Sequence, residues 1–159
     1  GEIVEKMPTE QHNIVSGNLF SPMKEFAKAH SLGRVVYETR YNVPGDKRNA
    51  RIPDIAFTRK ERLQPVVTKG SVSTLPDLIV EVQSPDQSEK FLRDKAAYFL
   101  KNGVRMVILV FTKLKAIKVQ PLAPDSSIQS KSLTINDTLD GGDVLPGFEM
   151  PMRDVFELE

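Results

Sequence analysis

Residues 78–111 read LIVEVQSPDQSEKFLRDKAAYFLKNGVRMVILVF, and this stretch decides the fold. The segment 78–83, apolar apart from Glu81, predicts a buried strand. The continuous apolar run 105–112 predicts a second strand that is buried on both faces. A strand, a helix and a strand within about 35 residues make a βαβ unit, so the two strands are expected to be parallel.

The helix of this unit is predicted over residues 84–102. Ser84 is expected to be its N-cap, with Pro85 in the first helical position and Gln87 completing a capping box. Gly103 follows the last helical residue, where glycine is favoured.

A second helix is predicted over residues 10–30, where apolar residues recur at intervals of three and four. Pro22 interrupts the pattern, so either the helix kinks there or a further helix begins with Ser21 as its N-cap. The short apolar patch within residues 1–8 predicts a strand.

Further strands are expected on both sides. The β-branched and aromatic stretches 34–43 and 51–58 predict a hairpin, joined by a polar loop over residues 44–50. Residues 116–120 predict a strand antiparallel to its predecessor, and residues 121–132 predict a loop.

The composition fits one folded domain, residues 1–159, with 40% hydrophobic and 27% charged residues. The absence of cysteine excludes a disulfide scaffold, a thiol nucleophile and zinc sites built on thiolates. His12 and His30 are the only histidines, which argues against a histidine-based metal cluster. No apolar run is long enough to span a membrane and no signal peptide opens the chain, so the expected address is cytoplasmic.

The net charge is only +1, but it is unevenly distributed. Residues 34–62 carry eight Lys and Arg against four Asp and Glu, and residues 90–118 carry eight against one. These basic blocks could contact phosphates, or they could form an ordinary solvated surface.

Glu81 is the first candidate for chemistry, because both faces of its predicted strand are apolar. A buried carboxylate needs a cation, a metal or a proton. Asp54 follows Pro53 at the head of the predicted strand 51–58; a turn aspartate is its other interpretation.

Lys95 completes the candidate set. Helical geometry places it on the apolar face of the predicted helix 84–102, whereas Lys90, Arg93 and Lys101 lie on the other face. It either snorkels over apolar surface or meets Glu81 or Asp54. Two carboxylates on adjacent strands can hold Mg2+ or Mn2+, and a lysine beside them can orient water or stabilise charge on a phosphate. This is the machinery of a metal-dependent phosphodiesterase.

The chain also resembles a known family. The segments RIPDIAF at 51–57, PDLIVEVQSP at 76–85 and KAAY at 95–98 look like the restriction-endonuclease-like family of unknown function that is expanded in cyanobacteria. The closing segments 139–143 and 145–148 fit it too, so the resemblance covers nearly the whole chain. That family belongs to the PD-(D/E)xK nuclease superfamily, which implies an α/β fold with a central mixed β-sheet flanked by helices.

The resemblance also implies site residues. The first acidic ligand falls on Asp54 and the second on Glu81. The usual lysine of the superfamily falls on Gln83; within this family it is moved to the following helix, which matches Lys95. Gln83 could still point at the metal, because it has the strand parity of Glu81.

Three more residues are weaker candidates. Glu5 and His12 match family positions near the site, although a solvated glutamate and a helix-surface histidine are the alternatives. Asp77 is the second choice for a ligand, four residues before Glu81. His30 is expected at the surface.

The implied function is a Mg2+- or Mn2+-dependent DNA endonuclease. The alternative is a catalytically inactive protein on the same fold that binds nucleic acid or acts as a dimeric interaction module. A metal-dependent hydrolase of another substrate is the third candidate. A homodimer is a further expectation, because two sites would reach two strands.

Overall fold

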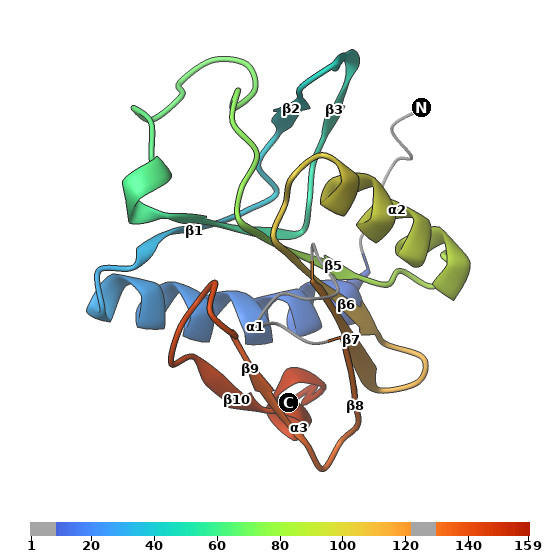
Figure 1. Ribbon diagram of the computed structural model, residues 1–159. Helices are drawn as coiled ribbons and strands as arrows, with labels where there is room; N and C mark the ends of the chain where they lie inside the picture. The colour runs from blue at the N-terminus through green and yellow to red at the C-terminus, as the bar shows by residue number, and fades with distance from the viewer. Residues whose placement is uncertain (1–8, 122–129) are drawn as a thin grey trace.

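The computed structural model describes residues 9–121 and 130–159, so the strand expected within residues 1–8 lies outside the described residues. A six-stranded mixed sheet carries helices on both of its faces (Figure 1). The α/β fold with a central mixed sheet, which the sequence predicts, is therefore confirmed. No helix of the described part is long and apolar enough to cross a membrane.

The sheet has the strand order β1-β4-β5-β6-β7-β8. Its strands are β1 (Gly33–Tyr37), β4 (Ile55–Arg59), β5 (Leu78–Val82), β6 (Met106–Phe111), β7 (Ala116–Pro121) and β8 (Lys131–Leu133). The central pair β5 and β6 is parallel, as the βαβ unit predicts, and β7 runs antiparallel to β6 as expected.

The sheet separates two apolar cores. One face is covered by α1 (Glu10–Ala29), β9 (Thr138–Asp140), β10 (Glu149–Pro151) and α3 (Met152–Val155), and the other by α2 (Glu89–Lys101) and the hairpin of β2 (Tyr41–Val43) and β3 (Asp46–Arg51). Along β5, Leu78 and Val80 pack in the core under α1, whereas Ile79 packs under α2. Because side chains alternate along a strand, Glu81 lies on the α2 face.

The predicted start of α2 is wrong by four residues. The helix begins at Glu89 and is capped by Ser88, whose side chain accepts a hydrogen bond from the amide of Phe91 at 3.0 Å. Residues 84–87 form a turn instead, in which the Gln87 amide donates to the Ser84 carbonyl at 3.0 Å. Pro85 takes the second position of this turn, where proline is also favoured.

The structure decides between the two alternatives for Pro22 and corrects two other expectations. α1 is one continuous helix through Pro22, and no second helix begins at Ser21. Residues 44–50 are not only a loop, because β3 begins at Asp46. The loop expected over 121–132 overlaps β8, which begins at Lys131; residues 122–129 lie outside the described part.

Candidate active site

Asp54 and Glu81 lie near each other at one end of the central strands. Asp54 directly precedes β4, whose first residue Ile55 pairs with Val80 of β5, and its carboxylate accepts a hydrogen bond from the amide of Val82, the residue after Glu81. Each residue is only 3% exposed. The fold therefore brings together two buried carboxylates, those of Asp54 and Glu81, which are 27 residues apart in the sequence.

The Asp54 carboxylate has contacts on both of its oxygens. Its Oδ2 accepts a hydrogen bond of 2.7 Å from the amide of Val82, and its Oδ1 lies 3.4 Å from Nε2 of His12. His12 is in the first turn of α1, after the N-cap Thr9, and is 4% exposed. The interpretation of His12 as a helix-surface histidine is therefore wrong.

The Glu81 carboxylate pairs with Lys95 of α2. The ammonium Nζ lies 3.0 Å from Glu81 Oε2 and 5.6 Å from the centre of the Phe91 ring. The Lys95 side chain is 24% exposed, so it reaches the buried acid while part of it meets solvent. The sequence left two alternatives for Lys95, a side chain that snorkels over apolar surface or one that meets Glu81 or Asp54, and the structure has the contact with Glu81.

Gln83 extends the same strand, but its side chain bonds to the neighbouring loops. Its Nε2 donates to the Gln87 carbonyl at 2.9 Å, and its Oε1 lies 3.5 Å from the amide of Lys113. The Ser84 amide in turn donates to Oε1 of Gln87 at 2.9 Å. These bonds hold the turn between β5 and α2, which fixes where α2 begins.

Asp77 lies apart from the other acids, at the opposite end of β5. Its Oδ2 accepts a hydrogen bond from the Arg59 amide at 2.8 Å, and its Oδ1 pairs with the Arg62 guanidinium at 3.0 Å. Asp77 is four residues before Glu81, and four residues of extended strand span about 13 Å. The structure thus places Asp54, Glu81, Lys95 and His12 at one end of the sheet and Asp77 at the other.

A polar cluster that the sequence did not predict ties the β2–β3 hairpin to α2. The hydroxyl of Tyr98 donates to Oδ2 of Asp46 at 2.5 Å, and the guanidinium of Arg51 lies 4.6 Å from the centre of the Tyr98 ring. The hydrogen bond from Tyr98 holds the pKa of the Asp46 carboxyl below its usual value. Burial, and to a smaller extent the same hydrogen bond, raises the pKa of Tyr98. Tyr98 lies one turn beyond Lys95, so the cluster braces the helix that carries the site lysine.

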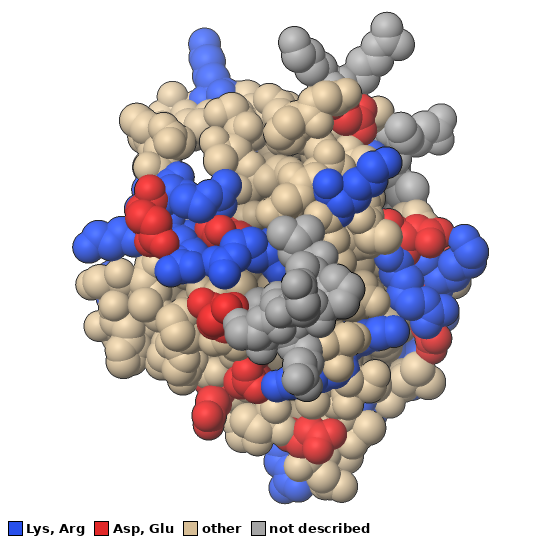
Figure 2. Space-filling view, viewed as in Figure 1, with Lys and Arg blue, Asp and Glu red and all other residues tan. Residues whose placement is uncertain are grey.

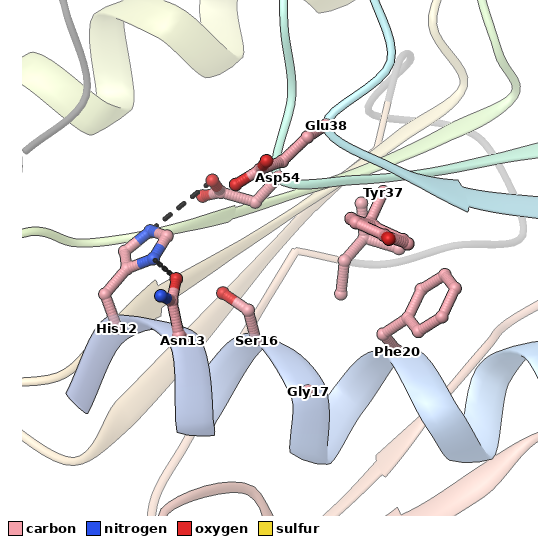
Figure 3. Close-up of a pocket in the computed structure, with 9 residues that line it drawn as sticks. His12, Asn13, Ser16, Gly17, Phe20, Tyr37, Glu38 and Asp54 are labelled. Atoms are coloured by element: carbon pink, nitrogen blue, oxygen red, sulfur yellow. Dashed lines mark hydrogen bonds and ion pairs between the residues drawn. The ribbon is translucent and has the colours of Figure 1, made fainter. Parts of the chain in front are cut away.

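A groove of about 360 Å3 opens beside Asp54 (Figure 3). Its floor is formed by His12, Ser16 and Phe20 of α1, and its wall is formed by Tyr37, Glu38 and Asp54. The three α1 residues recur every four positions in the sequence, which places them on one face of the helix. A histidine, a serine and a phenylalanine do not form a recognisable pattern, so the sequence analysis did not identify them. We call this feature the α1 groove.

Comparisons with known proteins identify the family of this chain. A model of the Uma2 family, described as "Putative restriction endonuclease", matches residues 1–153. The chain belongs to the Uma2 family. A search of curated proteins finds no match for this Uma2 chain.

A solved structure supports the Uma2 fold. The crystal structure of a putative nuclease belonging to DUF820, from Anabaena variabilis ATCC 29413, superposes with a TM-score of 0.80 at 21% sequence identity. The match covers 98% of this chain and 86% of that one. The resemblance to a restriction-endonuclease-like family of cyanobacteria, predicted from the sequence, is confirmed, and membership of the Uma2 family supports a nuclease-like function.

The donor chemistry of the Uma2 site fits a hard divalent cation. Asp54 and Glu81 offer carboxylate oxygens, which Mg2+ and Mn2+ prefer, at the same end of two paired strands. Within residues 9–121 and 130–159, no group of three or more His, Cys, Asp and Glu side chains could hold a metal. Glu5, which the family resemblance suggested as a further ligand, lies outside the described residues.

Proposed function

We propose that this protein is a Mg2+- or Mn2+-dependent DNA endonuclease with Asp54 and Glu81 as metal ligands and Lys95 as the catalytic cation. The observation that supports this most is the Lys95–Glu81 contact of 3.0 Å beside the buried Asp54, in a chain that belongs to a restriction-endonuclease family. The cytoplasm is the proposed location, and a homodimer is the proposed assembly for cleavage of both strands.

Asp54 and Glu81 would hold the divalent ion. When bound, the ion supplies Lewis-acid stabilisation of the charge on the cleaved phosphate and lowers the pKa of a bound water. The protein holds both carboxylates in place beforehand: Asp54 through the Val82 amide and His12, and Glu81 through Lys95. Little side-chain rearrangement is then needed to form the site.

Lys95 would act on the phosphate or on the attacking water. Its partly exposed ammonium can donate hydrogen bonds to an oxygen that gains negative charge in the transition state. Its position depends on the start of α2, which the hydrogen bonds of Gln83 fix. We therefore assign Gln83 a positioning role in place of direct contact with the metal.

A second candidate function has its own supporting observation. The acids already make contacts with Lys95, His12 and the Val82 amide, as expected of an inactive site whose charges are satisfied within the protein. Such a protein would bind nucleic acid without cleaving it. A metal-dependent hydrolase of a substrate other than DNA would use the same residues and is the third candidate.

Plasmid nicking with Mg2+, Mn2+ or EDTA tests the proposal. Wild-type protein is expected to nick only with a divalent ion, and Glu81→Gln and Asp54→Asn are expected to abolish nicking. Lys95→Met should lower the rate by about 100-fold or more, because it removes a catalytic cation.

Lys90→Met is the matched control for Lys95→Met. Lys90 lies on the same helix and pairs with Asp94 on the surface, so its loss should leave the rate unchanged. Circular dichroism establishes that each variant is folded. Metal-independent nicking, or equal rates in the wild type and Glu81→Gln, would refute the assignment. Folded wild-type protein that binds DNA but never nicks it would favour the second candidate.

A further inference from the structure

The α1 groove has two chemically different ends (Figure 3). One end holds the His12–Asp54 contact of the candidate active site. At the other end the rings of Phe20 and Tyr37 meet edge to face, with centroids 5.0 Å apart and planes at 77°. From His12 to Phe20 the helix rises about 12 Å, so both ends lie within the reach of one or two nucleotides.

The aromatic end is accessible to a ligand. Tyr37 is 61% exposed, which is high for a large aromatic side chain that already packs against another ring. The groove volume of about 360 Å3 lies at the lower end of the range for small-molecule sites. Exposed aromatic rings beside a nuclease-like site are the surfaces on which unstacked nucleobases bind.

Charge indicates which part of a nucleotide the groove accepts. Among the described residues that line it, Glu38 and Asp54 are acidic and none is Lys or Arg. The groove itself therefore disfavours a phosphate and suits an uncharged base. Lys24, one turn beyond Phe20, has its ammonium 5.7 Å from the Phe20 ring centre, where it can meet the sugar–phosphate backbone outside the groove.

We propose that the α1 groove is a base-binding subsite, in which Tyr37 and Phe20 stack an unpaired base of a strand whose sugar–phosphate backbone lies outside the groove. The inference rests on the proposed function, because it takes nucleic acid as the substrate. It adds a preference for single-stranded or locally unpaired nucleic acid, since a base inside a duplex cannot reach the rings.

The chain contains no tryptophan, so Tyr37→Trp introduces a single fluorescent reporter into the groove. The probe is a 12-nucleotide DNA strand of mixed sequence, titrated in EDTA so that no cleavage occurs. We expect the tryptophan emission to be quenched by the single strand, and much less by an abasic strand of the same length or by the duplex. Equal quenching by the abasic strand would overturn the proposal.

Leu114→Trp is the matched control. Leu114 lies in the turn between β6 and β7 and is 61% exposed, like Tyr37, but it does not line the groove. Its emission should change little with any of the three probes. Quenching of the same size at both positions would mean that the strand covers the surface without a base-binding site, which overturns the inference.

Affinity gives a second measurement. Stacking on one aromatic side chain is worth about 1–3 kcal/mol per base, so Tyr37→Ala should weaken binding of a fluorescein-labelled strand by about 5- to 150-fold, whereas Tyr37→Phe should keep wild-type affinity. Because both assays run in EDTA, they do not depend on catalysis. Quenching without nicking in Mg2+ would reject the endonuclease alone, and nicking without base-dependent quenching would reject the groove alone.

Discussion

At the scale of single residues, Tyr41 shows what burial does to a titratable side chain in this fold. It lies on β2, is 3% exposed, and packs in the core beneath α2. Burial raises its pKa to about 12, against smaller lowering effects from a hydrogen bond with Thr58 and from Arg34. The neutral phenol is therefore favoured in the folded protein well above the pH at which an unfolded chain would lose the proton.

The first prediction concerns alkaline pH. Because the folded-state pKa of Tyr41 is raised, its contribution to stability is complete below pH 10 and is lost as the pH rises from 10 towards 12. Over this interval the free energy of unfolding should fall by about 2–3 kcal/mol on account of Tyr41. Tyr41→Phe cannot ionise, so its stability should fall less over the same interval.

Urea unfolding at pH 8, 10 and 11.5 measures this difference. Tyr98, whose pKa is also raised, remains in the variant, so some alkaline loss should persist. An identical fall in the wild type and in Tyr41→Phe would contradict the prediction.

The sequence correctly indicated candidate residues where a charged side chain was expected among apolar neighbours. Glu81 within an apolar strand and Lys95 on an apolar helix face were each unusual alone, and the structure joins them. His12 was misjudged, although it continues the buried stripe of Val15, Leu19 and Met23 on α1. Its burial follows from that spacing, but its contact with Asp54 depends on how α1 crosses the sheet, which local sequence does not specify.

At the scale of elements, the start of α2 is set by competition between two serine caps. Ser84 and Gln87 satisfy each other within a turn, and Ser88 caps the helix that follows. Sequence pattern could not separate these possibilities, because proline at the second residue fits both a helix start and a turn. β3 was missed for a different reason: its sequence DKRNAR is polar, and it is a strand only because it pairs with β2.

The second prediction tests this helix start. Ser88→Ala removes the side chain that accepts from the Phe91 amide, so it should lower the free energy of unfolding by about 1 kcal/mol. Ser88→Asp keeps an acceptor and adds a favourable charge at the helix N-terminus, so it should retain wild-type stability. Chemical denaturation measures both; equal stability of Ser88→Ala and wild type would show that Ser88 is not the cap.

At the scale of the whole molecule, charge alone does not identify a nucleic-acid surface. Figure 2 shows Lys and Arg side chains gathered on two flanks, over β1 and η1 (Lys60–Arg62) and over α2, with acidic side chains among them. Several of these cations pair with acids, as in Arg59–Glu61, Arg62–Asp77 and Lys90–Asp94. The charges of the basic blocks are therefore partly neutralised at the surface. The candidate active site is identified from the buried acids Asp54 and Glu81 instead.

The placement of these acids follows from the topology. β4 begins and β5 ends at the same end of the sheet, because the two strands are antiparallel. α2 returns across that face because β5 and β6 are parallel and need a crossover. The sequence predicted the βαβ unit and both strands, but the β2–β3 hairpin and the small C-terminal β9–β10 sheet that complete the two cores came only from tertiary contacts.

The third prediction concerns the stability of the whole protein when a divalent ion binds. A ligand that binds only the folded state raises the free energy of unfolding by about 2.7 kcal/mol at 100 times its dissociation constant. For a chain of this size that corresponds to a rise of about 5–10 °C in Tm. Wild-type protein titrated with Mg2+ or Mn2+ should show such a rise, and excess EDTA should reverse it.

The rise should depend on both acids. Glu81→Gln and Asp54→Asn each remove one proposed ligand, so their Tm should respond much less to the ion. Glu149→Gln, at an exposed position of β10 on the face of the sheet opposite α2, should respond as the wild type does. Because Lys95 would compete with the proposed ion for Glu81, Lys95→Met should start from a lower Tm and gain more from the ion than wild type does. An equal rise in wild type and Glu81→Gln would place the ion elsewhere on the protein, and no rise in wild type would remove the metal from the proposed mechanism.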